Sequence, residues 1–166
     1  MIIFLFGLPG VGKNFLGDLI SKKYGLPFYD GDNEMGAEAK KLISEGKIIP
    51  QKLRDEYFQK IIYNMLLLKD TSKVSIVVQT LAKEENRKQL LDIFKDDIKF
   101  VFLTADKQTI LRRLKARKNH IVKPEYLETV ITYYEDPDIP HIAIDTGKGL
   151  SYIFQEMDKI IAPLLQ

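Results

Sequence analysis

Residues 2–13 read Ile2-Ile3-Phe4-Leu5-Phe6-Gly7-Leu8-Pro9-Gly10-Val11-Gly12-Lys13, and this stretch decides the fold. The apolar run from Ile2 to Phe6 is rich in β-formers, which predicts a short strand buried on both faces. The residues from Gly7 to Lys13 follow the pattern G-x-x-x-x-G-K. Apolar side chains then recur at helical spacing as far as Gly25. Strand, glycine loop and helix therefore follow one another as a phosphate-binding loop requires.

The chemistry of such a loop explains why these residue types are needed. Glycine lets backbone N–H groups come close to phosphate oxygens, and the N-terminus of the following helix adds partial positive charge. Lys13 would supply a point charge to the β- and γ-phosphates of a nucleotide. The alternative is a glycine-rich strand–helix turn that binds nothing. The predicted nucleotide-binding residues are Gly7, Leu8, Pro9, Gly10, Val11, Gly12, Lys13, Asn14 and Phe15.

Asn14 is a departure from the usual loop. The pattern normally continues with Ser or Thr, whose hydroxyl ligates Mg²⁺. An amide oxygen can also coordinate a hard cation, but the side chain is bulkier and its oxygen is placed differently. We therefore name Asn14 as a candidate metal ligand, and we expect water and acidic side chains elsewhere to supply more of the metal's shell.

Outward from the loop, segments with strand and helix character alternate. Further strands are expected at residues 26–29, 74–78, 98–103 and 142–144. Helices are expected at residues 34–45, 50–69, 124–135 and 151–162, and two more are expected to begin after residues 83 and 104. This alternation predicts a three-layer α/β fold with a mostly parallel five-stranded sheet and helices on both faces. The 166 residues contain no repeat or linker, so one domain over residues 1–166 is expected.

Composition excludes several classes of protein. Lys and Arg total 25 and Asp and Glu total 23, and a net charge of +2 gives no electrostatic argument for a nucleic-acid binder. The absence of Cys excludes disulfide scaffolds, thiolate metal sites and cysteine nucleophiles, and two His are too few for a multi-histidine metal cage. No apolar run is long enough for a membrane helix, and the apolar start lacks the marks of a signal peptide. We expect a cytoplasmic protein with no membrane partner.

Several further motifs resemble those of the gluconate kinases and their shikimate-kinase relatives, within the nucleoside-monophosphate-kinase-like P-loop fold. The stretch from Tyr29 to Asp32 is similar to the D-G-D at the end of the family's second strand. Residues 41–46, followed by Arg54, look like the gluconate kinases' K-M-S-x-G and its later Arg. Residues 79–83, with Arg87 after them, resemble C-S-A-L-K-x-x-Y-R.

The resemblance continues through the second half and so covers nearly the whole chain. Residues 100–103 and 112–120 are similar to F-V-x-L followed by R-L-x-x-R-x-x-H, and residues 126–137 to L-L-x-S-Q-F-x-x-L-E-x-P. The departures are concentrated where substrate is chosen. Residues 33–36 replace a His-Pro, Gln51 and Lys52 replace acidic residues, and Val130 replaces a Gln.

The resemblance implies roles for the charged residues. It implies that Asp30 organises Mg²⁺ through water, and that Asp32 accepts a hydrogen bond from the acceptor hydroxyl and acts as the base. Arg117 would stabilise developing charge as an internal arginine finger, and Arg113 would join it near the nucleotide. Arg117 would belong to a lid at about residues 117–124, which also includes His120. The alternatives are an Asx-rich turn for the two Asp and a solvated basic helix face for the two Arg.

The acceptor would bind near a helical segment at about residues 33–69. Arg54, Lys83 and Arg87 are candidates for holding its anionic group, the alternative being ordinary surface charge. Tyr57 and Phe58 are expected in the core on one helix. Tyr133 and Tyr134 could line a pocket, but packing is the expectation for both.

These expectations combine into an ATP- and Mg²⁺-dependent kinase that phosphorylates a hydroxyl of a small anionic polyol such as gluconate. One alternative is shikimate kinase or another small-molecule or nucleoside kinase of the same fold, although the G-G-x-x-x-R run of shikimate kinases is missing. A second, suggested by Asn14, is a nucleotide-binding module with weak or no catalysis. The expected partner is a small-molecule phosphate acceptor and not a nucleic acid, and the expected state is a monomer or homodimer.

Overall fold

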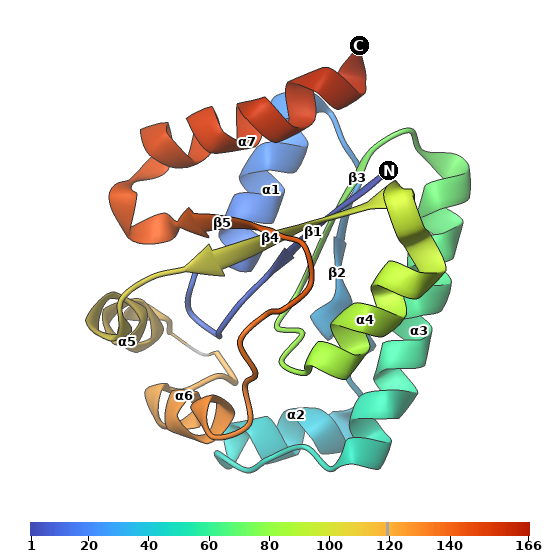
Figure 1. Cartoon of the computed structure of the whole chain (residues 1–166). Coiled ribbons are helices and arrows are strands. Elements are labelled where there is room, and N and C mark those ends of the chain that lie inside the picture. Colours follow the sequence, from blue (N-terminus) through green and yellow to red (C-terminus); the bar gives the residue numbers. More distant parts are fainter. Residues whose placement is uncertain (119) are drawn as a thin grey trace.

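A five-stranded parallel sheet forms the centre of the chain in the computed structural model, which describes residues 1–118 and 120–166 (Figure 1). The strands are β1 (Ile2–Phe6), β2 (Phe28–Asp30), β3 (Ser75–Gln79), β4 (Ile98–Thr104) and β5 (Ile142–Asp145). They lie in the order β2-β3-β1-β4-β5, and every neighbouring pair is parallel. The predicted α/β fold is confirmed.

Helices cover both faces of this sheet. They are α1 (Lys13–Tyr24), α2 (Ala37–Ser44), α3 (Gln51–Thr71), α4 (Glu84–Phe94), α5 (Lys107–Ala116), α6 (Pro124–Ile131) and α7 (Leu150–Leu165), with 3₁₀ turns η1 (Gly31–Glu34), η2 (Lys95–Asp97) and η3 (Thr146–Lys148). Among the described residues, no helix combines the length and apolar character needed to cross a membrane.

The alternation of side chains along β1 divides the core into two layers. Ile3 and Leu5 belong to a buried cluster with residues of α1 and α7, whereas Phe4 and Phe6 belong to one with residues of α3 and α4. Because successive side chains of a strand point to opposite faces, one apolar run supplies both layers. This is the two-faced burial that the sequence of β1 predicts.

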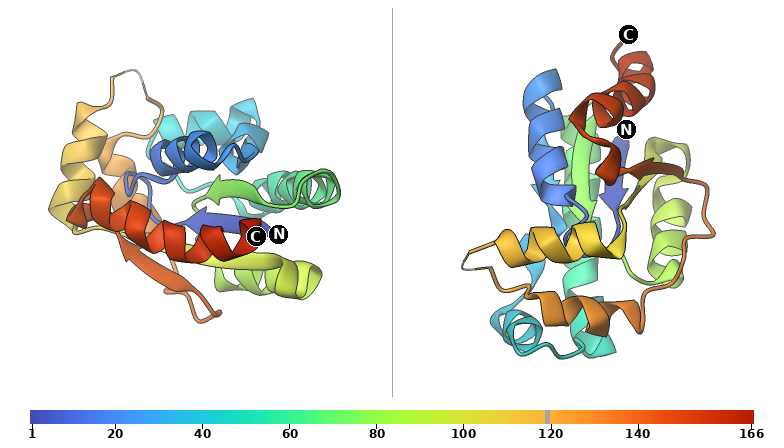
Figure 2. Two further views of the ribbon diagram at one scale, coloured as in Figure 1. Left: turned by 90° about the horizontal axis from the view of Figure 1, so that it is seen from above. Right: turned by 90° about the vertical axis from the view of Figure 1, so that its left-hand side faces the viewer.

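Parallel pairing brings the carboxyl ends of all five strands to one edge of the sheet. Figure 1 shows α2, α5 and α6 gathered beyond that edge, and both views of Figure 2 show α5 and α6 next to each other, away from the two termini. Ligands of open α/β sheets bind at this edge. The loops that follow β1, β2, β3 and β5 therefore converge on one region.

Several element boundaries differ from the prediction, and two of them have a clear physical reason. The helix expected over residues 124–135 ends at Ile131. Past it, the Glu135 N–H donates to the carbonyl of Ala82, 2.9 Å away, so the segment leaves helical geometry before Pro137. The helix expected from residue 34 begins at Ala37, because the 3₁₀ turn η1 extends as far as Glu34.

The predicted cap of α5 is Asp106, which accepts a hydrogen bond from the Thr109 N–H at 2.8 Å.

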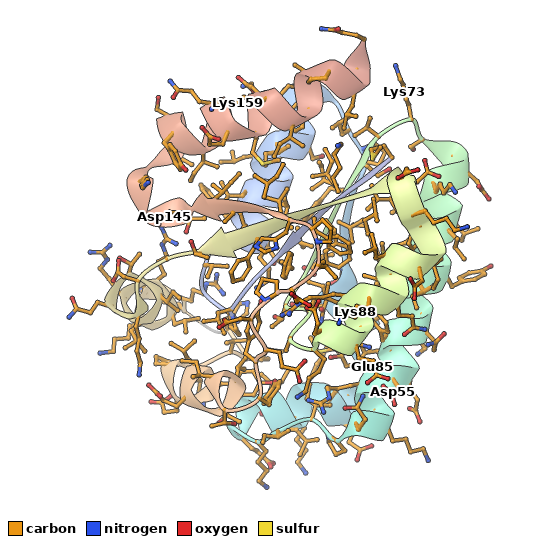
Figure 3. The ribbon with its side chains drawn as sticks, in the orientation of Figure 1. Asp55, Lys73, Glu85, Lys88, Asp145 and Lys159 are labelled. Atoms are coloured by element: carbon orange, nitrogen blue, oxygen red, sulfur yellow. The ribbon has the colours of Figure 1, made fainter. Side chains whose placement is uncertain are left out.

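Charges of both signs are mixed on the outer surface. Figure 3 shows the labelled side chains of Lys73, Glu85 and Lys159 extending outward from the ribbon, and all three residues are exposed. This mixing fits the small net charge of +2.

Candidate active site

The loop between β1 and α1 is held in a tight conformation. The Lys13 ammonium donates to the carbonyl oxygens of Gly7 and Leu8 at 2.9 and 3.0 Å, so the side chain folds back over its own loop. Gly12 has a φ of 105°, which L side chains rarely adopt. A Cβ at Gly10 would lie 2.9 Å from Leu114 of α5. The loop thus rests directly on the helix that leads to the predicted lid.

Two cavities meet at this loop. The larger, of about 500 Å³, extends from the loop to α3, α6 and the segment after β3. The smaller, of about 400 Å³, lies between the loop, α5 and the start of α7. Gly10, Gly12 and Arg117 line both. A nucleotide with its base in the smaller cavity would hold its phosphates at the loop and face an acceptor in the larger one.

Three ionisable groups lie close together on the wall of the larger cavity. Burial lowers the pKa of Lys13 to about 8, although the negative charges of Asp32 and Asp30 act to raise it. Burial raises the pKa of Asp32 to about 6, although Lys13 opposes that shift, and it also raises the pKa of Asp30. A desolvated ammonium beside two desolvated carboxylates is the kind of perturbed cluster that active sites contain.

The two aspartates at the end of β2 differ in their hydrogen bonds. Asp30 caps η1 by accepting from the Asp32 N–H at 2.9 Å through one carboxylate oxygen. Its other oxygen accepts a hydrogen bond from the Asn14 amide. Asp30 is therefore bound to the start of α1, and both Asp30 and Asp32 line the larger cavity.

The donor set next to Lys13 fits a hard cation. The carboxylates of Asp30 and Asp32 and the amide of Asn14 all carry oxygen, the ligand atom that Mg²⁺ prefers, and both carboxylates are desolvated. Within the described residues, no three His, Cys, Asp or Glu side chains come together as metal ligands. This suits an ion held largely by phosphate oxygens and water.

Arg117 and Arg113 occupy different environments. Arg117 lies just past α5, where partial desolvation and then Arg113 lower its pKa. Arg113 instead donates to the carbonyl of Val11 at 3.0 Å and to the hydroxyl of Thr146 at 2.8 Å. Arg113 therefore ties the phosphate loop to η3 beside the smaller cavity, while Arg117 lies open to both cavities.

The smaller cavity contains residues that the sequence reasoning missed. Thr146, Gly149 and Leu150 line it together with Phe15, which is 58% exposed. A signal was available, since the polar, glycine-containing turn after β5 lies at the same sheet edge as the phosphate loop.

Arg54 and Lys83 line the larger cavity, but Arg87 does not. Arg87 is fully buried and donates to the carbonyls of Leu81 and Glu135 at 3.0 and 2.7 Å and to the carboxylate of Glu84 at 2.8 Å. Its guanidinium is used by the protein itself. The structure thus corrects the assignment of Arg87 to substrate binding: this residue holds the loop after β3 in place.

The predicted lid and helical segment both border the larger cavity. Arg117, Lys118 and His120 of the lid line it, and Asn119 lies outside the described residues. The segment over residues 33–69 contributes Asn33, Met35, Lys40, Ile43, Ile49, Arg54, Tyr57 and Phe58.

Aromatic residues line the larger cavity where packing was expected. Tyr57 and Tyr133, for which packing was expected, both reach it, and so does Tyr126. Tyr134 packs elsewhere, with its ring 6.5 Å from the ring of Phe102. Val130, which replaces a Gln of the resembled motif, lies on the same wall.

Comparison with known proteins agrees with this geometry. A family model described as AAA domain matches residues 3–133. The chain is similar to a probable gluconokinase of Xenopus tropicalis, with 29% identity over 95% of this chain and 92% of the relative. It is also similar to a shikimate kinase of Aquifex aeolicus, with 29% identity over 82% of this chain and 79% of the relative.

The solved structure of a gluconokinase from Sinorhizobium meliloti 1021 has the same fold. It superposes with a TM-score of 0.80 at 25% identity, covering 98% of this chain and 91% of that one. The match covers nearly the whole chain and so includes the phosphate loop and the sheet. The chain therefore belongs to the AAA domain family, as an ATP-using P-loop small-molecule kinase related to the gluconokinases and to shikimate kinase.

Proposed function

We propose that this kinase transfers the γ-phosphoryl group of ATP, with Mg²⁺, to a hydroxyl of gluconate or a closely related sugar acid. One observation carries the proposal: Asp32 and Lys13 lie together where the phosphate loop opens into a cavity that also contains Arg54. Lys83 lines the same cavity, with its ammonium paired to the Glu135 carboxylate at 2.9 Å. A base beside the phosphates and cations farther along suit an acceptor with a hydroxyl and an anionic group. The related gluconokinases support this choice of acceptor.

In this reaction the acceptor oxygen forms a bond to the γ-phosphorus while the bond from that phosphorus to the β–γ bridging oxygen breaks. Asp32 accepts the hydroxyl proton. Its pKa of about 6 leaves the carboxylate ionised at neutral pH and makes it more basic than an ordinary carboxylate. Lys13 exchanges the carbonyls of Gly7 and Leu8 for phosphate oxygens, and Arg117 neutralises charge from the lid.

Asp30 and Asn14 would hold the hydrated Mg²⁺. When bound, the ion neutralises and aligns the phosphate oxygens. The hydrogen bond from Asn14 fixes the Asp30 carboxylate next to the loop. This carboxylate would then be oriented to accept hydrogen bonds from the metal's water ligands.

A second acceptor class is favoured by the aromatic wall. Tyr57, Phe58, Tyr126 and Tyr133 present rings to the larger cavity, and rings of this kind pack well against the flat face of a cyclic acid. Shikimate is such an acid, and a shikimate kinase is among the relatives. We propose further that the protein acts in the cytoplasm as a monomer or homodimer, without a nucleic-acid or membrane partner.

A coupled assay for ADP release tests the proposal. The wild-type protein is incubated with Mg²⁺-ATP and, separately, gluconate, other sugar acids, shikimate and the neutral polyol glucitol. Gluconate is expected to give the highest kcat/KM, and shikimate as best acceptor would instead establish the second class. If ATP binds but no acid accelerates its turnover, the chain is a nucleotide-binding module and the proposal is wrong.

A further inference from the structure

Gln79, the last residue of β3, is a buried polar side chain to which the proposed mechanism assigns no task. Only 6% of the residue is exposed, and it lies on the wall of the larger cavity. In the parallel pairing of β2 with β3, Asp30 lies opposite Val78, so Gly31 comes next to Gln79. A Cβ at Gly31 would lie 3.1 Å from the Cγ of Gln79, which is closer than ordinary van der Waals contact. The glycine between the two aspartates therefore leaves room for this side chain.

The loop after β3 fixes the orientation of the Gln79 amide. The Oε1 atom of Gln79 accepts a hydrogen bond from the N–H of Leu81. Leu81 has a φ of 48°, which residues other than glycine rarely adopt, and its carbonyl accepts from Arg87 at 3.0 Å. Because the loop uses the oxygen of the amide, the Nε2 group with its two N–H donors is directed to other partners.

These partners are a carboxylate and a phenol on the same cavity wall. The Gln79 side chain forms hydrogen bonds with Asp32 and with Tyr57. Burial raises the pKa of Asp32, whereas Lys13 and the hydrogen bond with Gln79 lower it, as donation to an ionised carboxylate does. Burial also raises the pKa of Tyr57, and its hydrogen bond with Gln79 acts in the opposite direction. One amide thus joins the base, a phenol of α3 and the loop after β3.

We propose that Gln79 is a positioning residue, which holds the Asp32 carboxylate in the orientation that receives the acceptor's proton. A general base must lie within hydrogen-bond reach of the proton that it takes, and a donor fixed by the loop restricts the rotation of the carboxylate. Gln79 stands where the resembled motif C-S-A-L-K has Cys, whose shorter side chain offers only a weak S–H donor. The inference rests on the proposed function, because Gln79 acts through Asp32.

A double-mutant cycle of Gln79→Met with Asp32→Asn tests the inference, because Met keeps the length of the side chain and removes the amide. In the wild-type background, Gln79→Met should lower kcat roughly 10- to 100-fold, the loss expected for a hydrogen bond to a charged group. In the Asp32→Asn background it should lower kcat less than about threefold, because the group through which it acts is already altered. The Kd for ATP should stay within about threefold in both backgrounds. Gln155→Met, at an exposed position of α7, is the matched control and should leave kcat unchanged.

The outcomes separate this role from a structural one and from the kinase proposal. Equal losses of kcat in both backgrounds, or no loss in either, would overturn the positioning role while the kinase proposal stands. If Asp32→Asn alone keeps the kcat of wild type, the assignment of the base fails and the positioning role fails with it. If an acceptor other than gluconate is best, the cycle is run with that acceptor and the same criteria hold. A chain without acceptor-stimulated turnover would overturn both proposals. Gln79→Asn, which withdraws the amide by one methylene, replaces Gln79→Met in the cycle if the latter does not fold.

Discussion

The Asn14 amide donates a hydrogen bond to the carboxylate of Asp30, which joins the start of α1 to the end of β2. The same carboxylate accepts from the backbone of Asp32 at 2.9 Å. An unusual residue after the phosphate-binding lysine is thereby connected to both aspartates. In the proposed reaction, this contact would orient Asp30 toward the predicted metal site.

Asn14→Ser should keep or raise Mg²⁺-dependent turnover, because a hydroxyl at this position is the metal ligand that such loops usually offer. The Mg²⁺ concentration for half-maximal rate should fall or stay the same. The measurement is a Mg²⁺ titration at saturating ATP and acceptor. A folded Asn14→Ser protein without turnover would show that the amide itself is required.

Lys13→Ala should lower kcat/KM by at least about 100-fold while the fold persists, because in the proposed reaction the ammonium acts on phosphates. In the free protein it donates hydrogen bonds to two loop carbonyls. Lys22→Ala is the matched control on the same helix, since Lys22 is exposed and paired with Asp18. Steady-state kinetics and thermal unfolding of both variants check this. Near-normal kcat in Lys13→Ala would contradict the role of the loop.

Arg87→Met and Arg54→Met should separate a structural arginine from a binding one. Arg87→Met leaves Glu84 and two carbonyls without their buried partner, so the free energy of unfolding should fall by about 3 to 5 kcal/mol. Arg54→Met should change stability little and raise the acceptor KM. Urea unfolding and acceptor kinetics give the two readouts. The reverse pattern would contradict the placement of both residues.

Local pattern was sufficient to predict the fold and the positions of the glycine loop, Asp30 and Asp32. The apolar run of β1 and the glycine loop are contiguous, and Asp30 and Asp32 follow a strand directly, so short-range sequence fixes their positions. Parallel strands then bring these ends together without further information.

The acceptor end depended on contacts between distant segments. Arg87 reads as an exposed helix charge, yet Glu135, 48 positions away, accepts from it. Tyr133 reads as a packing residue, because nothing local shows that its hydroxyl lies 3.2 Å from that of Tyr126 or that its ring lies against the guanidinium of Arg54 of α3. Side chains whose partners lie on another element need the tertiary structure to be assigned.

The pH dependence of stability should change in Asp32→Asn. In the folded protein the pKa of Asp32 is about 6, raised from 3.8, so the native state binds this proton more tightly than the unfolded chain. The stability that this group contributes is present below about pH 4 and is lost as pH rises through about 6. Asp32→Asn should therefore be more stable than wild type at pH 7.5, by about 1 to 3 kcal/mol. Urea unfolding at pH 5 and pH 7.5 measures the difference, and equal stability at pH 7.5 would contradict the desolvation of Asp32.

The most direct test of the central claim compares kcat and ATP affinity in Asp32→Asn. Asp32 is assigned to the acceptor proton, a role in the transition state, so kcat with gluconate should fall roughly 10²- to 10⁴-fold. The Kd for ATP, from calorimetry with Mg²⁺, should stay within about threefold of wild type, because the nucleotide contacts are left intact. A kcat close to that of wild type, or a loss of ATP binding equal to the loss of rate, would contradict the account.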